Sequence, residues 1–108
     1  MLEFNQVDKY LNDKGAISSQ PFDDDLLAYS LDATRIAYVG RNSRPLRLSL
    51  RCNPGLAKSL ISEYESVMPG HKLDPKKWIT ILDTGQLEEQ QIFDLIDHAF
   101  LESQSVNN

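Results

Sequence analysis

Hydrophobic residues recur at helical spacing near both ends of the chain and again in its middle. Residues 1–14 place their apolar positions roughly on one helical face, and residues 87–102 repeat that pattern. A third helix is expected to start at Asn53 and Pro54 and to run to about Val67, because asparagine caps free N–H groups and proline fits the first helical position. The hydrophobic pattern therefore predicts three amphipathic helices.

Between the helices, apolar and polar residues alternate with the period of a β-strand. Four strands are expected, at residues 27–31, 35–39, 46–52 and 78–82. Residues 18–25 contain a proline and three consecutive aspartates, so they are expected to form a loop. Residues 103–108 are expected to fray. These elements follow one another in the order α-β-β-β-α-β-α.

The third of these strands shows the clearest alternation. Its three leucines and Cys52 share one face, whereas Arg47, Ser49 and Arg51 share the other. We expect a solvated basic face opposite an apolar core face, which is typical of an antiparallel sheet covered by helices on one side only. The predicted fold class is α+β, a two-layer sandwich with an antiparallel sheet and helices on one face.

Length and composition restrict the class of protein further. The chain has 108 residues, of which 41% are hydrophobic and 25% are charged, so a single globular domain spanning residues 1–108 is expected. No apolar run approaches the roughly 20 residues that span a bilayer. The first residues form neither a basic nor an apolar signal segment. The expected location is therefore the cytoplasm, without membrane contact.

The net charge of −5 hides a basic middle segment. Residues 35–77 carry nine basic and three acidic side chains, a local charge of +6, and the rest of the chain carries −11. A local basic patch matters more for nucleic-acid binding than the total charge does. The middle segment is therefore the candidate for such binding.

Four local strings, in this order along the chain, resemble those of the MmcQ/YjbR family. They occupy residues 48–54, 68–73, 76–80 and 92–100, and the resemblance covers roughly residues 20–103. In the family these positions correspond to a strand end, a proline-glycine turn, a basic pair before a tryptophan strand, and a closing helix. The resemblance implies a fold similar to frataxin (CyaY-like) or to type III secretion chaperones, and it implies DNA binding.

The sequence departs from the family pattern at several positions. Arg51 and Asn53 stand where lysine and aspartate are more usual, and the proline-glycine turn lacks its tyrosine. Ala99 and Phe100 replace the polar and aromatic pair that ends the last helix in the family. A role that depends on the missing hydroxyl groups is therefore not expected here.

Ten residues are candidates for contact with nucleic acid. They are Arg35, Arg41, Arg44, Arg47, Arg51, His71, Lys72, Lys76, Lys77 and Trp78. Cations bind phosphates, and an exposed indole stacks on an unpaired base. In the alternative interpretation Trp78 fills the edge of the core. The arginines then pair with Asp23 to Asp25, with Asp83 or with the acidic last helix, which would leave a neutral surface.

The sequence predicts neither catalysis nor a cofactor. It contains no glycine-rich phosphate loop, metal-ligand cluster or nucleophile elbow. Cys52 is the only cysteine, and we expect it to be a buried side chain, with a reactive thiol as the alternative. Acidic side chains of the last helix keep binding of a hard cation open as a further alternative: Glu88, Glu89, Asp94 and Asp97.

A protein-interaction or chaperone-like module is the second functional interpretation. In that case the open sheet face or an edge strand recruits a protein partner or a second copy of the chain, and Tyr29, Tyr38 and Trp78 are the candidate anchors. A large exposed apolar patch would favour this interpretation, whereas a continuous stripe of arginine and lysine would favour nucleic acid.

Overall fold

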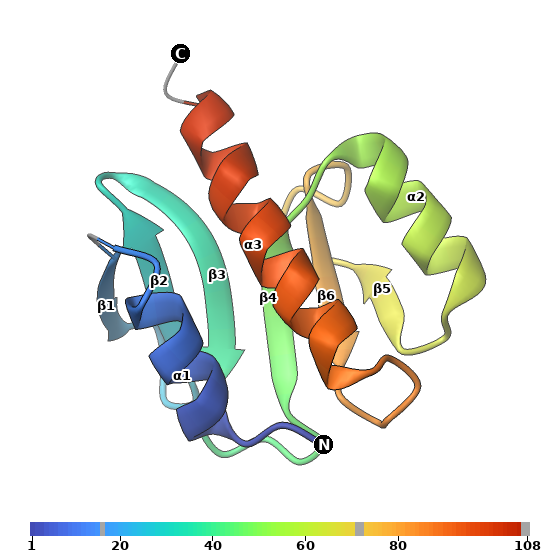
Figure 1. Cartoon of the computed structure of the whole chain (residues 1–108), viewed down its shortest axis with the longest axis horizontal. Helices are drawn as coiled ribbons and strands as arrows, with labels where there is room; N and C mark the ends of the chain where they lie inside the picture. The colour runs from blue at the N-terminus through green and yellow to red at the C-terminus, as the bar shows by residue number, and fades with distance from the viewer. Residues whose placement is uncertain (16, 71–72, 107–108) are drawn as a thin grey trace.

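Three helices lie on one face of a six-stranded sheet in the computed structural model, which describes residues 1–15, 17–70 and 73–106 (Figure 1). Along the chain the elements are α1 (Phe4–Asn12), β1 (Ile17–Pro21), β2 (Leu26–Leu31), β3 (Thr34–Gly40), β4 (Arg47–Arg51), α2 (Pro54–Glu63), β5 (Val67–Pro69), β6 (Trp78–Leu82) and α3 (Glu89–Val106). None of the described helices is long and apolar enough to cross a membrane.

The strands are arranged in the order β1-β2-β3-β4-β6-β5, and every neighbouring pair is antiparallel. Leu48 lies opposite Val39 on one side and Ile81 on the other, so these three side chains share a face. Tyr38 and Ser49 pair in the neighbouring row and therefore point to the opposite face. The sheet thus has one face that packs against the helices and one that we call the helix-free face.

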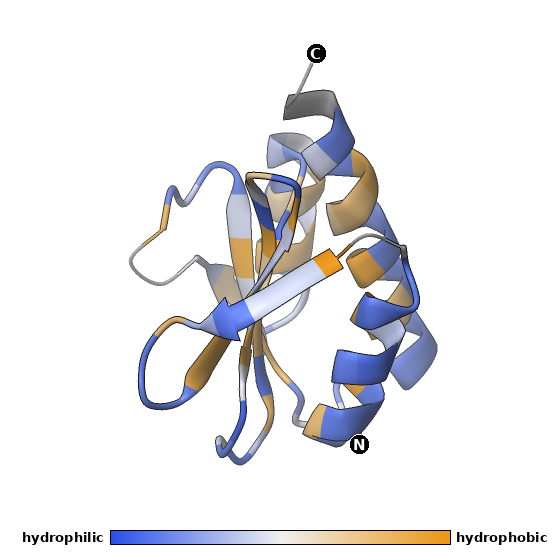
Figure 2. Cartoon of the chain, turned by 90° about the vertical axis from the view of Figure 1, so that its left-hand side faces the viewer, coloured by the Kyte–Doolittle hydropathy of each residue, from blue (hydrophilic) through white to orange (hydrophobic). Residues whose placement is uncertain are grey.

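The main core lies between the sheet and the helices. α3 crosses β3 and β4 at the centre, α1 covers the β1 and β2 side, and α2 covers β5 and β6 (Figure 1). Leu50 of β4 and Ile79 of β6 are 0% exposed, and they belong to the same apolar cluster as Ile92 and Ile96 of α3. Figure 2 shows the two layers from the side, with the sheet separate from the helices.

The predicted α+β class is confirmed, and the structure adds two strands to the predicted elements. Residues 18–25, expected to form a loop, contain most of β1, which pairs with β2 along its whole length. β1 is an edge strand with almost entirely exposed side chains, so it lacks the alternation that marks a buried strand. Pro21 fits this position because an edge strand tolerates the loss of an N–H donor.

The ends of the helices also differ from the expected boundaries. α1 is shorter than residues 1–14, and α2 ends at Glu63 because Tyr64 has an extended backbone, with φ −122° and ψ 124°. The chain therefore leaves the helix before Val67, and Val67–Pro69 form β5. α3 continues beyond Glu102, where the Ser103 hydroxyl donates to the carbonyl of Phe100 at 2.6 Å.

Candidate nucleic-acid interface

The centre of the helix-free face is covered, contrary to the solvated face expected from the sequence. Ser49 of β4 and Thr80 of β6 are buried, and their hydroxyl oxygens lie 2.9 Å apart. Leu73, in the connection between β5 and β6, packs against the small apolar cluster of Ala28, Tyr38 and Trp78 on this face. Among the described residues, these buried side chains leave less of the helix-free face open to solvent than the sequence predicted.

A β-bulge brings Arg35 onto the helix-free face. Tyr29 pairs with Ala37 and the next residue, Ser30, pairs with Arg35, so Ile36 is the extra residue in β3. A bulge shifts the alternation of side chains by one position. Ile36 accordingly joins the main core at 0% exposure, and the guanidinium of Arg35 lies beside aromatic rings of the other face.

The Arg35 guanidinium lies against the rings of two aromatic residues. Its Cζ atom is 5.7 Å from the ring centroid of Tyr38 and 5.9 Å from that of Phe22, both within cation–π range. The Phe22 and Tyr38 rings meet edge to face, with centroids 4.9 Å apart at 69°. The Nη1 atom of Arg35 is buried and has no hydrogen-bond partner in the part of the chain that the structure describes.

Arg51 lies in the adjacent strand and is held in a similar way. Its Nε atom donates to the backbone carbonyl of Arg35 at 2.9 Å, and its Cζ atom lies 4.9 Å from the Trp78 ring centroid. Partial burial lowers the pKa of the Arg51 guanidinium from its ordinary value, and electrostatic interactions with Tyr38 and Glu102 oppose this change. Arginine remains protonated in proteins, so the site keeps its positive charge.

Arg47 lies at the opposite end of β4 and is exposed. Four residues along a strand separate Arg47 from Arg51 by roughly 13 Å. No hydrogen bond or ion pair joins the Arg47 guanidinium to any residue in the described ranges. Arg47 is therefore available to a ligand without breaking an existing contact.

Neutralisation of the arginines by carboxylates is not found in the described ranges, where no arginine forms an ion pair. Arg41 does contact the 23–25 segment, but it donates to the backbone carbonyls of these aspartates at 3.0 to 3.3 Å. Asp83 is buried, and its Oδ2 atom accepts a hydrogen bond from the N–H of Leu2 at 2.6 Å. The helix-free face therefore retains its positive charges.

The structure brings only part of the predicted basic set together. Arg35, Arg47, Arg51 and Trp78 share the helix-free face, but Trp78 is 6% exposed, so its indole is not free to stack on a base in this conformation. Exposed Lys77 borders the Arg51 end, since its carbonyl accepts from the N–H of Cys52 at 2.8 Å.

The remaining candidates lie away from this group or are not described. Exposed Lys76 borders a groove against α2, together with Lys58. Arg41 and Arg44 border a separate hollow beside the N-terminal segment. His71 and Lys72 lie outside the residues that the structure describes.

Phe22 belongs to this surface and was not among the candidates from the sequence. It is 57% exposed although it contacts Tyr38. The only signal in the sequence is a single aromatic residue beside three aspartates, which also fits an ordinary turn. Its place on the face depends on the pairing of β1 with β2, which brings residue 22 next to β3.

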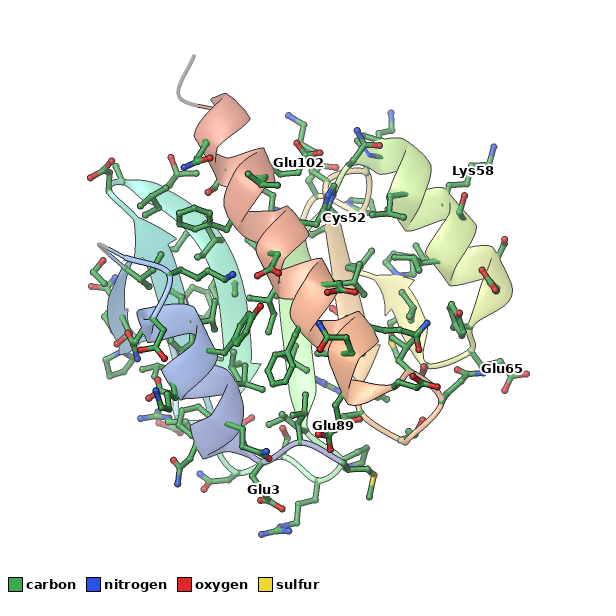
Figure 3. All side chains as sticks on the ribbon, in the orientation of Figure 1. Glu3, Cys52, Lys58, Glu65, Glu89 and Glu102 are labelled. Atoms are coloured by element: carbon green, nitrogen blue, oxygen red, sulfur yellow. The ribbon has the colours of Figure 1, made fainter. Side chains whose placement is uncertain are left out.

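Cys52 follows the end of β4, lies beside α3 near Glu102 and belongs to the main core (Figure 3). Burial raises the pKa of its thiol to about 11, and the negative charge of Glu102 adds to this rise. The thiol is therefore protonated at neutral pH, whereas a nucleophilic cysteine needs the thiolate. In the described part of the chain, no three His, Cys, Asp or Glu side chains are grouped in a way that could hold a metal ion.

We expect the stability of the protein to fall as the pH rises from about 9 to about 11, because the thiol of Cys52 ionises in the unfolded chain before it ionises in the folded one. The Cys52→Ala variant should lack this part of the pH dependence. Urea unfolding of both proteins across this pH range measures the difference. Burial also raises the pKa of Tyr29, but this residue contributes equally to the pH dependence of both proteins. If the free energy of unfolding changed with pH in the same way in both proteins, Cys52 would not be the source of this pH dependence.

The antiparallel sheet, the helices on one face and the arginine-bearing opposite face define an α+β domain with a candidate anion-binding surface. The family model described as YjbR matches residues 11–102, so the chain belongs to the YjbR family. No curated protein matches the sequence.

The fold is also found in solved structures of other proteins. The chain is similar to a Deinococcus radiodurans protein, DR2400, with a domain described as DUF419, at a TM-score of 0.84 and 23% identity over 94% of this chain and 78% of that one. It is also similar to a Pseudomonas syringae protein, at a TM-score of 0.78 and 20% identity over 94% of this chain and 99% of that one.

Proposed function

We propose that this YjbR-family domain is a non-enzymatic binding module that contacts the phosphates of nucleic acid through its helix-free face. The observation that carries the proposal is the group of Arg35, Arg47 and Arg51, which come from two neighbouring strands and share one face without a carboxylate partner in the described residues. Arginine forms bidentate hydrogen bonds with phosphate, so such a group is suited to a polyanion.

The arginines differ in how far they are prepared for binding. Arg35 and Arg51 are held by aromatic rings and, for Arg51, by a backbone carbonyl, so little side-chain freedom remains to be lost. Arg47 is exposed, and its guanidinium is free to reach a phosphate. Lys77 extends the basic surface at the Arg51 end. We therefore expect Arg47 and Lys77 to make the first contacts.

The negative total charge limits the strength of this binding. A protein of net charge −5 is repelled from nucleic acid at long range, so attraction depends on the local basic surface and on salt. Three phosphate contacts predict roughly 40-fold weaker binding when salt rises from about 50 to about 200 mM. Affinity for any sequence is expected in the range of about 1 to 100 µM, which is typical of contacts to the backbone alone.

The test is a fluorescence-anisotropy titration of labelled single-stranded and duplex DNA at these two salt concentrations. The Arg47→Glu, Lys77→Glu double variant is expected to bind at least about tenfold more weakly and to show a smaller salt dependence. The control is Lys9→Glu with Lys58→Glu, which changes the net charge equally. Both control lysines are exposed on helices of the other layer, and Figure 3 shows Lys58 pointing away from α2.

Equal losses in the two double variants would mean that total charge, and not this face, determines binding. No detectable binding at the lower salt would overturn the proposal. In that case a protein partner becomes the better candidate, because Phe22 exposes 57% of its surface beside the apolar side chains of Leu26 and Leu73.

A further inference from the structure

A groove opens on the helix-free face between the segment around Phe22 and the connection that carries Leu73. Its volume is about 340 Å³, at the lower end of the range for small-ligand sites. Apolar side chains of Phe22, Leu26, Tyr38 and Leu73 form part of its lining. The polar part of the lining consists of Asp23, Asp25, Arg47 and Ser49.

We propose that this groove receives one unpaired cytosine or adenine base, held through its exocyclic amino group, with an adjacent phosphate on Arg47. The inference rests on the proposed function and adds to it the strand type and the base. It predicts that the domain binds single strands more tightly than duplexes.

Phe22 provides the stacking surface. Three large hydrophobic side chains are exposed in the described residues: Met1, Phe22 and Leu101. Phe22 is the aromatic residue among them. Its ring meets Tyr38 edge to face, which fixes the ring while leaving much of it accessible. Stacking of a base on an aromatic side chain needs no particular sequence, because every base has a π-face. A duplex cannot offer a base to Phe22 in this way, since its bases are stacked on one another.

Two charged residues of the lining, Arg47 and Asp25, orient the nucleotide. The guanidinium of Arg47 has no partner among the described residues and can bind the phosphate. Asp25 belongs to the same lining; its Oδ1 accepts the N–H of Asn42 at 2.9 Å, and its Oδ2 accepts no hydrogen bond from a described residue. A carboxylate oxygen is a suitable acceptor for the amino group of cytosine or adenine, and thymine lacks that group.

The experiment compares oligo(dC), oligo(dA) and oligo(dT) with a duplex of equal length by fluorescence anisotropy at low salt. We expect the dC and dA strands to bind about 5- to 150-fold more tightly than the duplex, which is the range for one stacked base. Phe22→Ala should remove this advantage and weaken duplex binding far less, since there it only loosens the cation–π contact with Arg35, while Phe22→Trp should retain the advantage. Leu101→Ala, another exposed apolar position, is the matched control.

Asp25→Asn tests the choice of base. Its amide oxygen can still accept the N–H of Asn42, while its NH₂ group replaces the free oxygen, so the preference for dC over dT should disappear or reverse.

Distinct outcomes separate this inference from the proposed function. If the protein bound duplex and single strands equally tightly, or if Phe22→Ala weakened both equally, the groove would not be a base-binding site. The proposal of phosphate binding would then still stand. Wild-type binding that is as tight for dT as for dC would overturn the role of Asp25. No binding of any oligonucleotide would overturn both proposals.

Discussion

A Trp78→Ala variant is expected to lose about 3–5 kcal/mol of its free energy of unfolding. Trp78 is 6% exposed and belongs to the apolar cluster on the helix-free face. Its ring lies 5.5 Å from the ring of Tyr38 and 4.9 Å from the Arg51 guanidinium carbon, and Leu73 packs against the same cluster. Alanine would leave a cavity beneath the connection from β5 to β6. Urea denaturation followed by circular dichroism measures the loss.

The control for this variant is Leu101→Ala on α3, where the side chain is 61% exposed and a loss within about 0.5 kcal/mol is expected. Trp78→Phe should lose less than Trp78→Ala, since it keeps most of the apolar volume. If Trp78→Ala were as stable as the control, the indole would not be packed in the protein. Trp78 would then again be a candidate for stacking on a base.

Leu50→Ala is expected to destabilise the protein by about 2–5 kcal/mol through the other face of the sheet. Leu50 is 0% exposed in β4, between Ala37 of β3 and Ile79 of β6, and it lies in the core that α3 covers. Deleting its methyl groups leaves a void that neighbouring strands cannot close without breaking their pairing. Because net stabilities of domains are about 5–15 kcal/mol, this single change removes a large share of the total.

The same urea assay tests this second variant, and its result bears on the layer structure. A loss below about 1 kcal/mol would mean that α3 does not seal the centre of the sheet. Leu50→Ile provides a volume-conserving comparison and should cost less than about 1.5 kcal/mol. Nucleic-acid binding per folded molecule should remain unchanged in Leu50→Ala, because Leu50 does not lie on the helix-free face.

Local patterns in the sequence predicted the elements that have one buried and one exposed side. Asn53 caps α2 as expected, since its Oδ1 atom accepts the N–H of Gly55 at 2.9 Å. β1 and β5 were missed for a physical reason. Both are edge strands, one almost wholly exposed and one only three residues long, so neither has an alternation to detect.

The candidate interface was predictable only within single strands. Alternation alone placed Arg47 and Arg51 on one face, and the register of β4 with β6 agrees. The same rule applied to β3 puts Arg35 on the face of Ala37 and Val39, toward the core. The bulge at Ile36 moves Arg35 to the opposite, helix-free face. The bulge arises from the pairing of β3 with β2, and the sequence of one strand does not specify that pairing.

The amino-acid sequence alone determined the α+β class, the apolar side of each main element and the basic middle segment, because side-chain periodicity and charge are local properties. The tertiary structure decided which charges meet. It joined Arg35 to Arg51, placed Arg44 elsewhere, buried Trp78 under Leu73 and brought Phe22 and Arg47 into the lining of one groove. These contacts depend on strand register and on connections folding over the sheet, which are long-range interactions that periodicity does not specify.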